Sequence, residues 1–221
     1  AERNMGSGRL MGFIDNVCPS ANEMPPQNEK NGEKVKCDSN EPPCIFIYKT
    51  TNESHVGELS FFKVYAGTVK SGMELENENT GVTEKLNQLF LIEGNKRTNV
   101  NELVAGDIGA TLKLKNTHVN NTLHAKGKSH ELPPIEFPKP NMTIAVESVK
   151  KGEEEKLSIA LHQLRDEDPT LIVEYSPELK QLLIHCQGDM HLAVAKWKME
   201  NLFKLDVKFS KPKIPYRETI R

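Results

Sequence analysis

The sequence predicts two β-containing domains of different kinds, a small antiparallel β-barrel followed by an α+β domain with the element order β-α-β-β-α-β. Three observations lead to this prediction. Short apolar runs bounded by glycine recur between residues 44 and 130, four prolines interrupt the chain at 133–140, and strand-like and helical apolar spacings alternate beyond them. A length of 221 residues is enough for two modest domains.

A short helix and a polar stretch precede the predicted barrel. Residues 8–17 carry apolar side chains at a helical spacing, namely Leu10, Phe13, Ile14 and Val17. A helix this short is not stable alone in water, so we expect its apolar face to pack on a partner upstream of residue 1. Residues 27–42 contain almost no apolar side chain and are typical of a linker or a solvated loop.

The barrel prediction rests on four runs rich in strand-forming residues, CIFIYKT, HVGELSFFKVYAGTVKSG, EKLNQLFLIEG and DIGATLKL. Short strands at regular spacing with glycine turns favour a small antiparallel barrel, which we assign to residues 28–132. The proline-rich residues 133–140 form a stiff, extended linker and are our candidate hinge between the two domains.

Residues 141–211 have the periodicity of the second domain. A strand at 142–149 precedes a helix that begins at the acidic residues 153–155, and two strands, LIVEY and LLIHC, follow. A second helix runs from Asp189 to Phe203, and LDVKF is the last strand. The predicted apolar face of that second helix consists of Met190, Ala193, Val194 and Trp197. This element order is the split βαβ, or ferredoxin-like, motif.

Composition excludes several classes of protein. A net charge of −2 argues against a strongly basic nucleic-acid binder, although a local basic face is compatible with it. The four cysteines show no two-residue spacing, so we expect free thiols in a reducing cytoplasm rather than zinc ligands or disulfides. The first residues do not have the pattern of a signal peptide, and we expect a cytoplasmic protein.

Nucleotide and metal motifs are incomplete. Gly127-Lys128-Ser129 ends like a phosphate-binding loop, but Thr122 occupies the position of the required first glycine. Thr98 stands where a guanine-binding Asn-Lys-x-Asp motif needs aspartate. His118, His124 and His130 recur every sixth residue, which is not a helical repeat, and we interpret them as solvent-facing loop residues rather than metal ligands. We therefore predict no GTP site, no metal and no enzymatic activity in this chain.

Two groups of polar residues are candidate contact sites. Lys63 stands among strand aromatics, and Lys96 and Arg97 fall in a predicted barrel loop, so these three could contact an RNA backbone or simply face solvent. Glu167 and Asp168 follow the first helix of the second domain. A carboxylate pair there could serve acid–base chemistry or contact a neighbouring domain, but formation of a turn is the interpretation we favour.

Several long runs resemble one family in collinear order. HVGELSFFKVYAGTVKSG (55–72) resembles the barrel of translational GTPases, above all elongation factor G, and GNKRTNV (94–100) and LVAGDIGA (103–110) resemble its next barrel signatures. EFPKPNMTIAVES (136–148), LRDEDPTLIVEY (164–175) and GDMHLAVAKWKM (188–199) resemble its third domain. PKIPYRETIR (212–221) resembles the start of its fourth domain, and residues 1–27 resemble the end and exit of its GTPase domain.

The resemblance implies a role on the ribosome. GTP and Mg²⁺ would be bound by an upstream domain of the parent protein, and the translation-factor-type barrel would lie against small-subunit ribosomal RNA. The ferredoxin-like domain would pack against the GTPase domain and contact a small-subunit ribosomal protein, with Glu167, Asp168, Asp189 and His191 as candidate contacts. The expected protein is a monomer that promotes GTP-dependent translocation of tRNA and mRNA and does not bind membranes.

Departures from the family pattern leave alternatives open. Asp189 and Met190 replace the glutamate and first leucine of a Gly-Glu-Leu-His-Leu run, which suggests a diverged copy that recycles or protects ribosomes instead. A self-contained ferredoxin-like enzyme would need an arginine-bearing anion loop, but Lys150-Lys151-Gly152 is followed by three glutamates. A generic RNA-binding barrel would have a more basic balance.

Overall fold

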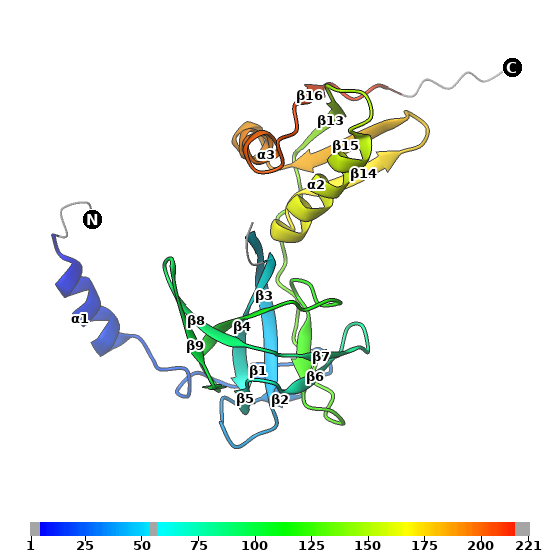
Figure 1. Cartoon of the computed structure of the whole chain (residues 1–221). Helices are drawn as coiled ribbons and strands as arrows, with labels where there is room; N and C mark the ends of the chain where they lie inside the picture. The colour runs from blue at the N-terminus through cyan, green and yellow to red at the C-terminus, as the bar shows by residue number, and fades with distance from the viewer. Residues whose placement is uncertain (1–4, 54–56, 215–221) are drawn as a thin grey trace, which may run out of the picture. The chain divides into compact units, whose positions relative to one another are not determined.

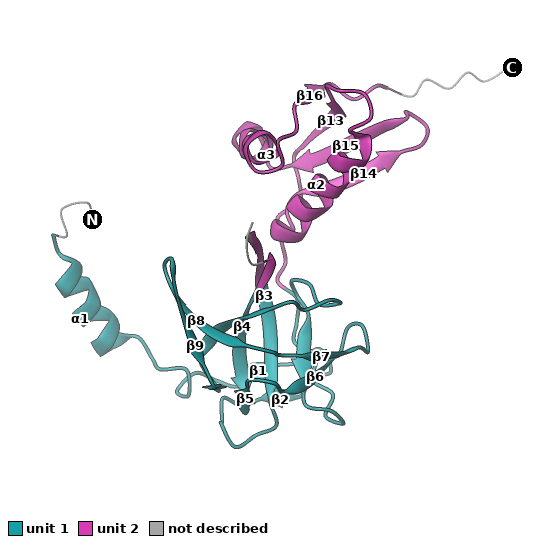
Figure 2. Ribbon diagram, viewed as in Figure 1, with its two compact units in different colours: residues 1–48, 60–134 teal, residues 49–59, 135–221 magenta. Residues whose placement is uncertain are grey.

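The structure is a computed structural model that describes residues 5–53 and 57–214 (Figure 1). The chain forms two compact units, one made of residues 1–48 and 60–134 and the other of residues 49–59 and 135–221 (Figure 2). The second unit therefore includes the outer part of one hairpin of the barrel. The predictions that fall on residues 1–4, 54–56 and 215–221, including most of the fourth-domain segment, lie outside the described residues.

The elements up to residue 134 are one helix followed by short strands. In chain order they are α1 (Ser7–Val17), β1 (Gln27–Asn28), β2 (Lys34–Val35), β3 (Cys44–Glu53), β4 (Gly57–Ala66), β5 (Thr68–Lys70), β6 (Glu74–Asn77), β7 (Thr83–Lys85), β8 (Leu89–Glu93), β9 (Lys96–Val100), β10 (Glu102–Val104), β11 (Ile108–Leu112) and β12 (Thr122–His124).

The barrel is built on one eight-stranded sheet with the strand order β7-β6-β12-β3-β4-β11-β8-β9, which curls around its core (Figure 1). Two smaller pairs, β1 with β2 and β10 with β5, complete the first unit and are antiparallel. Alternate residues of the strands point inward. Among the largest fully buried side chains are Ile45, Ile47, Phe62, Leu75, Leu89 and Leu123. The predicted barrel is confirmed.

Two features before the barrel differ in how well they were predicted. The helix predicted at 8–17 is α1, and its apolar side chains are exposed, so its packing on a partner stays a prediction. Residues 27–42 are not a free linker, because they form β1 and β2 and bury Glu29 and Val35 against the barrel. The solvated-loop interpretation holds for most of the segment, which is exposed, but it missed this short hairpin and its two buried side chains.

The second unit is a four-stranded sheet with two helices. Its elements are β13 (Met142–Ser148), α2 (Glu154–Glu167), β14 (Ile172–Ser176), β15 (Gln181–Cys186), α3 (Asp189–Asn201) and β16 (Val207–Ser210). The strand order is β14-β15-β13-β16 and every neighbouring pair is antiparallel. The helix α2 buries the predicted stripe of Leu157, Ala160, Leu161 and Leu164. The ferredoxin-like fold is confirmed.

None of the helices in the described part of the chain is long and apolar enough to cross a membrane.

Candidate interaction surfaces

Lys63 is held at the outer surface of the barrel by the alternation of side chains along β4. Phe62 and Val64 are fully buried, so Lys63 and Tyr65 point to the opposite face of the sheet. The Lys63 ammonium lies 5.1 Å from the centre of the Tyr65 ring, which is a cation–π contact. A lysine restrained in this way loses less side-chain entropy when it contacts a partner.

Lys96 and Arg97 lie in a strand, which corrects the prediction that they belong to a loop. A turn at Gly94 and Asn95 joins β8 to β9, with Glu93 opposite Lys96 in the register. Successive residues of a strand point to opposite faces, so the two cations do not share one face of the sheet. Because β9 ends the eight-stranded sheet, both side chains can still reach a partner that approaches this edge.

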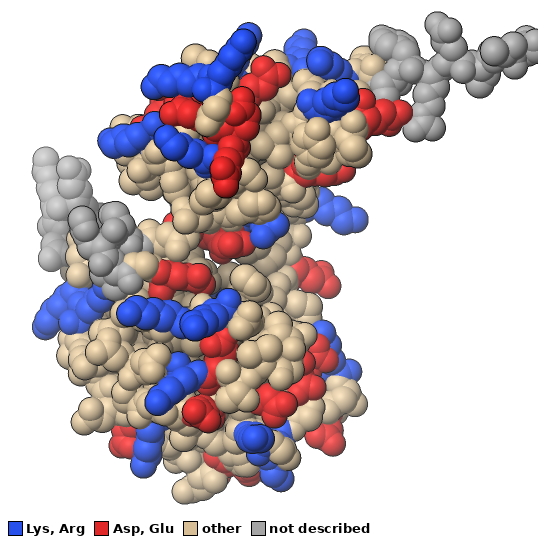
Figure 3. Space-filling model, turned by 45° about the vertical axis from the view of Figure 1, so that its right-hand side comes forward, with Lys and Arg blue, Asp and Glu red and all other residues tan. Residues whose placement is uncertain are grey.

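The three candidate cations do not form one cluster. Two strands, β11 and β8, separate β4 from β9 in the sheet. Neighbouring strands lie roughly 4.8 Å apart, so β4 and β9 are about 14 Å apart along the curled sheet. Basic and acidic side chains are interspersed on the face shown in Figure 3. Contact with a polyanion would therefore depend on a few positioned cations rather than on a broad basic field.

Glu167 bonds to two other elements of the second unit. At the end of α2, its Oε2 lies 2.7 Å from Lys198 Nζ of α3. Its Oε1 accepts a hydrogen bond of 2.9 Å from the backbone N–H of Asn52, in the part of β3 that belongs to the same unit. The carboxylate is mostly buried and thus joins three elements. Sequence reasoning selected Glu167 but could not find its partners, which lie 31 and 115 residues away.

Asp168 and His191 are brought together by the structure. His191 Nε2 lies 3.1 Å from Asp168 Oδ2, while His191 Nδ1 accepts a hydrogen bond of 3.2 Å from the backbone N–H of Gln187. These two bonds fix the imidazole tautomer with its proton on Nε2. The other oxygen of Asp168 accepts hydrogen bonds from the backbone N–H and the hydroxyl of Thr170. The pair therefore fixes the turn after α2 against the start of α3.

Asp189 and the exposed face of α3 are the part of this region that remains open to a partner. Asp189 lies in the first turn of α3 and is exposed, unlike Glu167 and His191. The predicted apolar face of α3 was wrong as a core face, because Met190 and Trp197 are 80% and 57% exposed. The helix packs on the sheet through a second stripe instead, with Ala195 and Met199 buried and Leu192 half-buried.

The surroundings of Gly127-Lys128-Ser129 differ from those of a phosphate-binding loop. The Gly127-Lys128-Ser129 segment follows β12 and does not lead into a helix. The Ser129 hydroxyl donates a hydrogen bond of 2.9 Å to Glu78, whose carboxylate would repel a phosphate at this place. In the described part of the chain, no three His, Cys, Asp or Glu side chains lie close enough to hold a metal ion.

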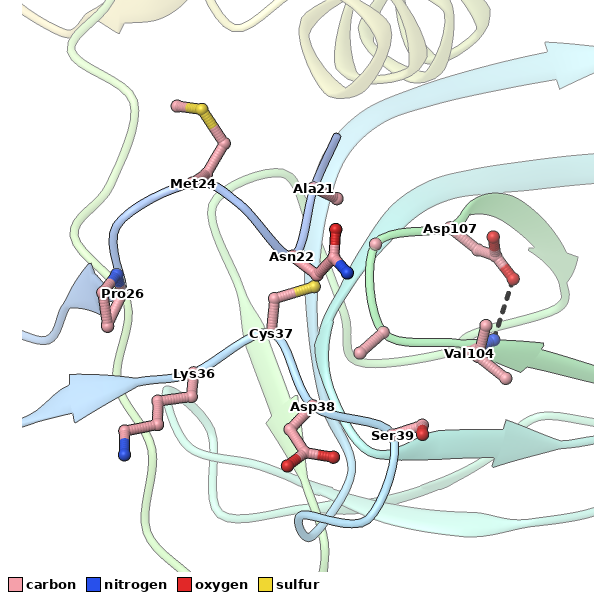
Figure 4. Close-up of a pocket in the computed structure, with 12 residues that line it drawn as sticks. Ala21, Asn22, Met24, Pro26, Lys36, Cys37, Asp38, Ser39, Val104 and Asp107 are labelled. Carbon is pink, nitrogen blue, oxygen red and sulfur yellow. Dashed lines mark hydrogen bonds between the residues drawn. The ribbon is translucent and has the colours of Figure 1, made fainter. Parts of the chain in front are cut away.

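Sequence reasoning did not find one cavity in the first unit. It has a volume of about 720 Å³ and lies between residues 21–39 and the turn from β10 to β11 (Figure 4). The Asp107 carboxylate lines it and accepts a hydrogen bond of 2.8 Å from the backbone N–H of Val104. A Cβ on Gly106 would lie 2.8 Å from the Ala21 side chain, so glycine permits this close approach. Its mixed lining indicates no particular ligand.

Together the folds define a class of protein in which a translation-factor-type barrel precedes a ferredoxin-like domain. Residues 42–126 match the family model for elongation factor G domain 2, and residues 137–211 match the model for elongation factor G domain III. The chain is therefore a member of the elongation factor G family and carries these two domains in the family's order.

A solved structure is similar over the whole chain. It is the crystal structure of a protein from Thermus thermophilus, which is 30% identical, with a TM-score of 0.81. The alignment covers 100% of this chain and 31% of the other, so this chain spans less than a third of the length of that protein. The predicted barrel range 28–132 is wider than the matched range 42–126, and the predicted second domain begins at 141 where the match begins at 137, so these boundaries stay predictions.

Proposed function

We propose that this chain is the ribosome-docking and interdomain-coupling part of an elongation factor G-like protein that promotes GTP-dependent translocation of tRNA and mRNA. The observation that carries the proposal is the ordered match to domains II and III, with a structural match that extends over the full chain. GTP and Mg²⁺ would be bound elsewhere in the parent protein, and this chain would not hydrolyse GTP. The parent would act as a monomer in the cytoplasm.

In this proposal the barrel contacts small-subunit ribosomal RNA through its positioned cations. Lys63 is restrained by Tyr65, and Lys96 and Arg97 lie on an edge strand that a phosphate backbone can approach. Lysine on an edge strand also prevents unwanted strand pairing, so protection of the edge is the alternative role of Lys96.

The second unit would relay the nucleotide state of the GTPase domain of the parent protein. Glu167, Asp168 and His191 would act by positioning, since their polar atoms are engaged inside the unit. Asp189 and the exposed apolar side chains of α3 would contact a ribosomal protein or another domain of the parent. Residues 133–140 would be the hinge, because domains joined by a short linker move relative to one another by default.

The second candidate function is ribosome recycling or protection by a diverged member of the same family. The observation that favours it is the replacement of glutamate and leucine by Asp189 and Met190 at the start of α3. Because Met190 is strongly exposed, this change alters a surface and not the core. Translocation and subunit-splitting assays on the parent protein would separate the two roles.

The test of docking is co-sedimentation of the purified chain with small ribosomal subunits over a series of salt concentrations. We expect Lys96→Ala with Arg97→Ala to weaken binding and to reduce the slope of log affinity against log salt by roughly 1.4 to 1.8, the effect of two lost phosphate contacts. The matched control removes two exposed charges from another loop of the barrel, with Lys126→Ala and Lys128→Ala. If the two double variants have the same affinity and the same salt dependence, Lys96 and Arg97 are solvent-facing residues with no specific role in binding.

A further inference from the structure

The hairpin that precedes the barrel is fixed by a buried carboxylate. We name residues 27–35, which contain β1 and β2, the entry hairpin. The Glu29 side chain is only 1% exposed, and its Oε1 lies 2.7 Å from His130 Nδ1. Its Oε2 accepts a hydrogen bond of 3.3 Å from the backbone N–H of Glu131. A carboxylate removed from water needs such partners, because an unpaired buried charge is costly.

His130 and Glu131 belong to the segment through which the chain leaves the barrel. We name residues 129–132 the exit segment, since Pro133 follows it directly. The Lys30 backbone N–H donates a hydrogen bond of 3.0 Å to the Glu131 carbonyl, and the Lys30 ammonium pairs with the Glu131 carboxylate. Backbone and side-chain bonds thus join two segments that are about a hundred residues apart in the chain.

The entry hairpin and the exit segment also share one small apolar core. It consists of Val35 from the hairpin, Leu132 from the exit segment, and Cys44, Phe46 and Ala66 from the barrel. Cys44 is fully buried, and burial, helped by the negative charge of Glu29, raises the pKa of its thiol to about 12. Neither segment can leave the barrel without exposing part of the same core.

We propose that Glu29 and His130 form a clasp, through which the entry hairpin and the exit segment open and close as one cooperative unit. The Glu29 carboxylate loses its hydrogen-bond donors if either segment leaves the barrel. Opening of one segment therefore removes bonds that hold the other in place. The role of the clasp rests on the proposed function. There, the entry hairpin follows the region that resembles the exit of the GTPase domain, and the exit segment leads into the hinge at 133–140. The clasp would connect the exit of the GTPase domain to the hinge along one side of the barrel.

Hydrogen exchange read by mass spectrometry on the purified chain tests the clasp without ribosomes. In His130→Ala we expect exchange to rise together in the entry hairpin and the exit segment, by roughly tenfold to a hundredfold, as expected for a buried group left unpaired. Strands β8 and β9 should keep their protection. Cys44 should react with iodoacetamide faster by a similar factor. His130→Asn, which retains a donor near the position of Nδ1, should restore much of the protection, and the exposed His118→Ala is the matched control.

Faster exchange in the entry hairpin alone, or in neither segment, would overturn the clasp. If His130→Ala unfolds the whole barrel, Glu29→Gln decides the question, because the amide keeps the shape and one acceptor oxygen but removes the charge and the second acceptor. In that variant a joint increase supports the clasp, and separate or absent increases reject it. A failure of ribosome binding would leave this result unchanged, so the two proposals can fail independently.

Discussion

Glu167 gives the sharpest quantitative prediction for the second unit, because one carboxylate holds two partners from two other elements. Its bonds to Lys198 and to the Asn52 backbone N–H are both charge-assisted, and both charged side chains are less than one-third exposed. Hydrogen bonds to charged groups contribute about 1.5–3 kcal/mol each. With allowance for solvent screening, Glu167→Ala should lower the free energy of unfolding of this unit by about 2–4 kcal/mol.

The assay is urea unfolding followed by the fluorescence of Trp197. It is the single tryptophan of the chain and lies on α3 next to Lys198, so its signal reports the second unit. Glu167→Gln retains an oxygen for the Asn52 N–H and should lose about half as much stability. The control is Asp166→Ala, which breaks only the exposed pair with Arg165 and should cost less than about 0.5 kcal/mol. A loss in Glu167→Ala no larger than in this control would refute the reasoning.

Two further predictions concern the barrel and the nucleotide. The Cys44 thiol has its pKa raised from 9.0 to about 12 by burial, so above pH 9 the unfolded state ionises first. From this thiol alone the first unit should lose roughly 1.4 kcal/mol of stability per pH unit between pH 9 and pH 12. In urea unfolding followed by circular dichroism, Cys44→Ala should show a smaller loss over this range and keep the part due to Tyr48 and Tyr65, whose pKa values burial also raises. A fluorescent GTP analogue titrated into the chain with Mg²⁺ should not bind, and saturable micromolar binding would contradict our prediction that this chain has no nucleotide site.

Periodicity predicted the second unit well except where a helix carries two apolar stripes. The buried face of α2 could be predicted because the helix has a single apolar stripe, made of Leu157, Ala160, Leu161 and Leu164. On α3, the stripe of Met190, Val194 and Trp197 competes with that of Leu192, Ala195 and Met199. Spacing alone cannot decide which stripe faces the sheet. The prediction followed the stripe that contains Trp197, whereas the stripe of Leu192, Ala195 and Met199 packs on the sheet.

Pairings across long sequence separations were the part that the sequence could not predict. The segment at 27–42 is polar because several of its polar groups have partners on the barrel, and the bond of Glu29 to His130 spans 101 residues. The same reason explains why His124 was placed in a loop facing solvent. It lies on β12, is buried, and bonds to Glu78. By contrast, the strand position of Lys96 was predictable, since Gly94-Asn95 is a hairpin turn signal.

The division of β3 and β4 between the two compact units affects any attempt to separate them. The long hairpin begins in the barrel, yet residues 49–59 cluster with the ferredoxin-like unit. A cut after residue 134 would release a fragment without Asn52, and the Glu167 carboxylate would lose a donor that the chain supplies from far upstream. The modules that exchange or fold independently in this chain are therefore not two consecutive stretches of sequence, and an isolated second domain should be less stable than its own core suggests.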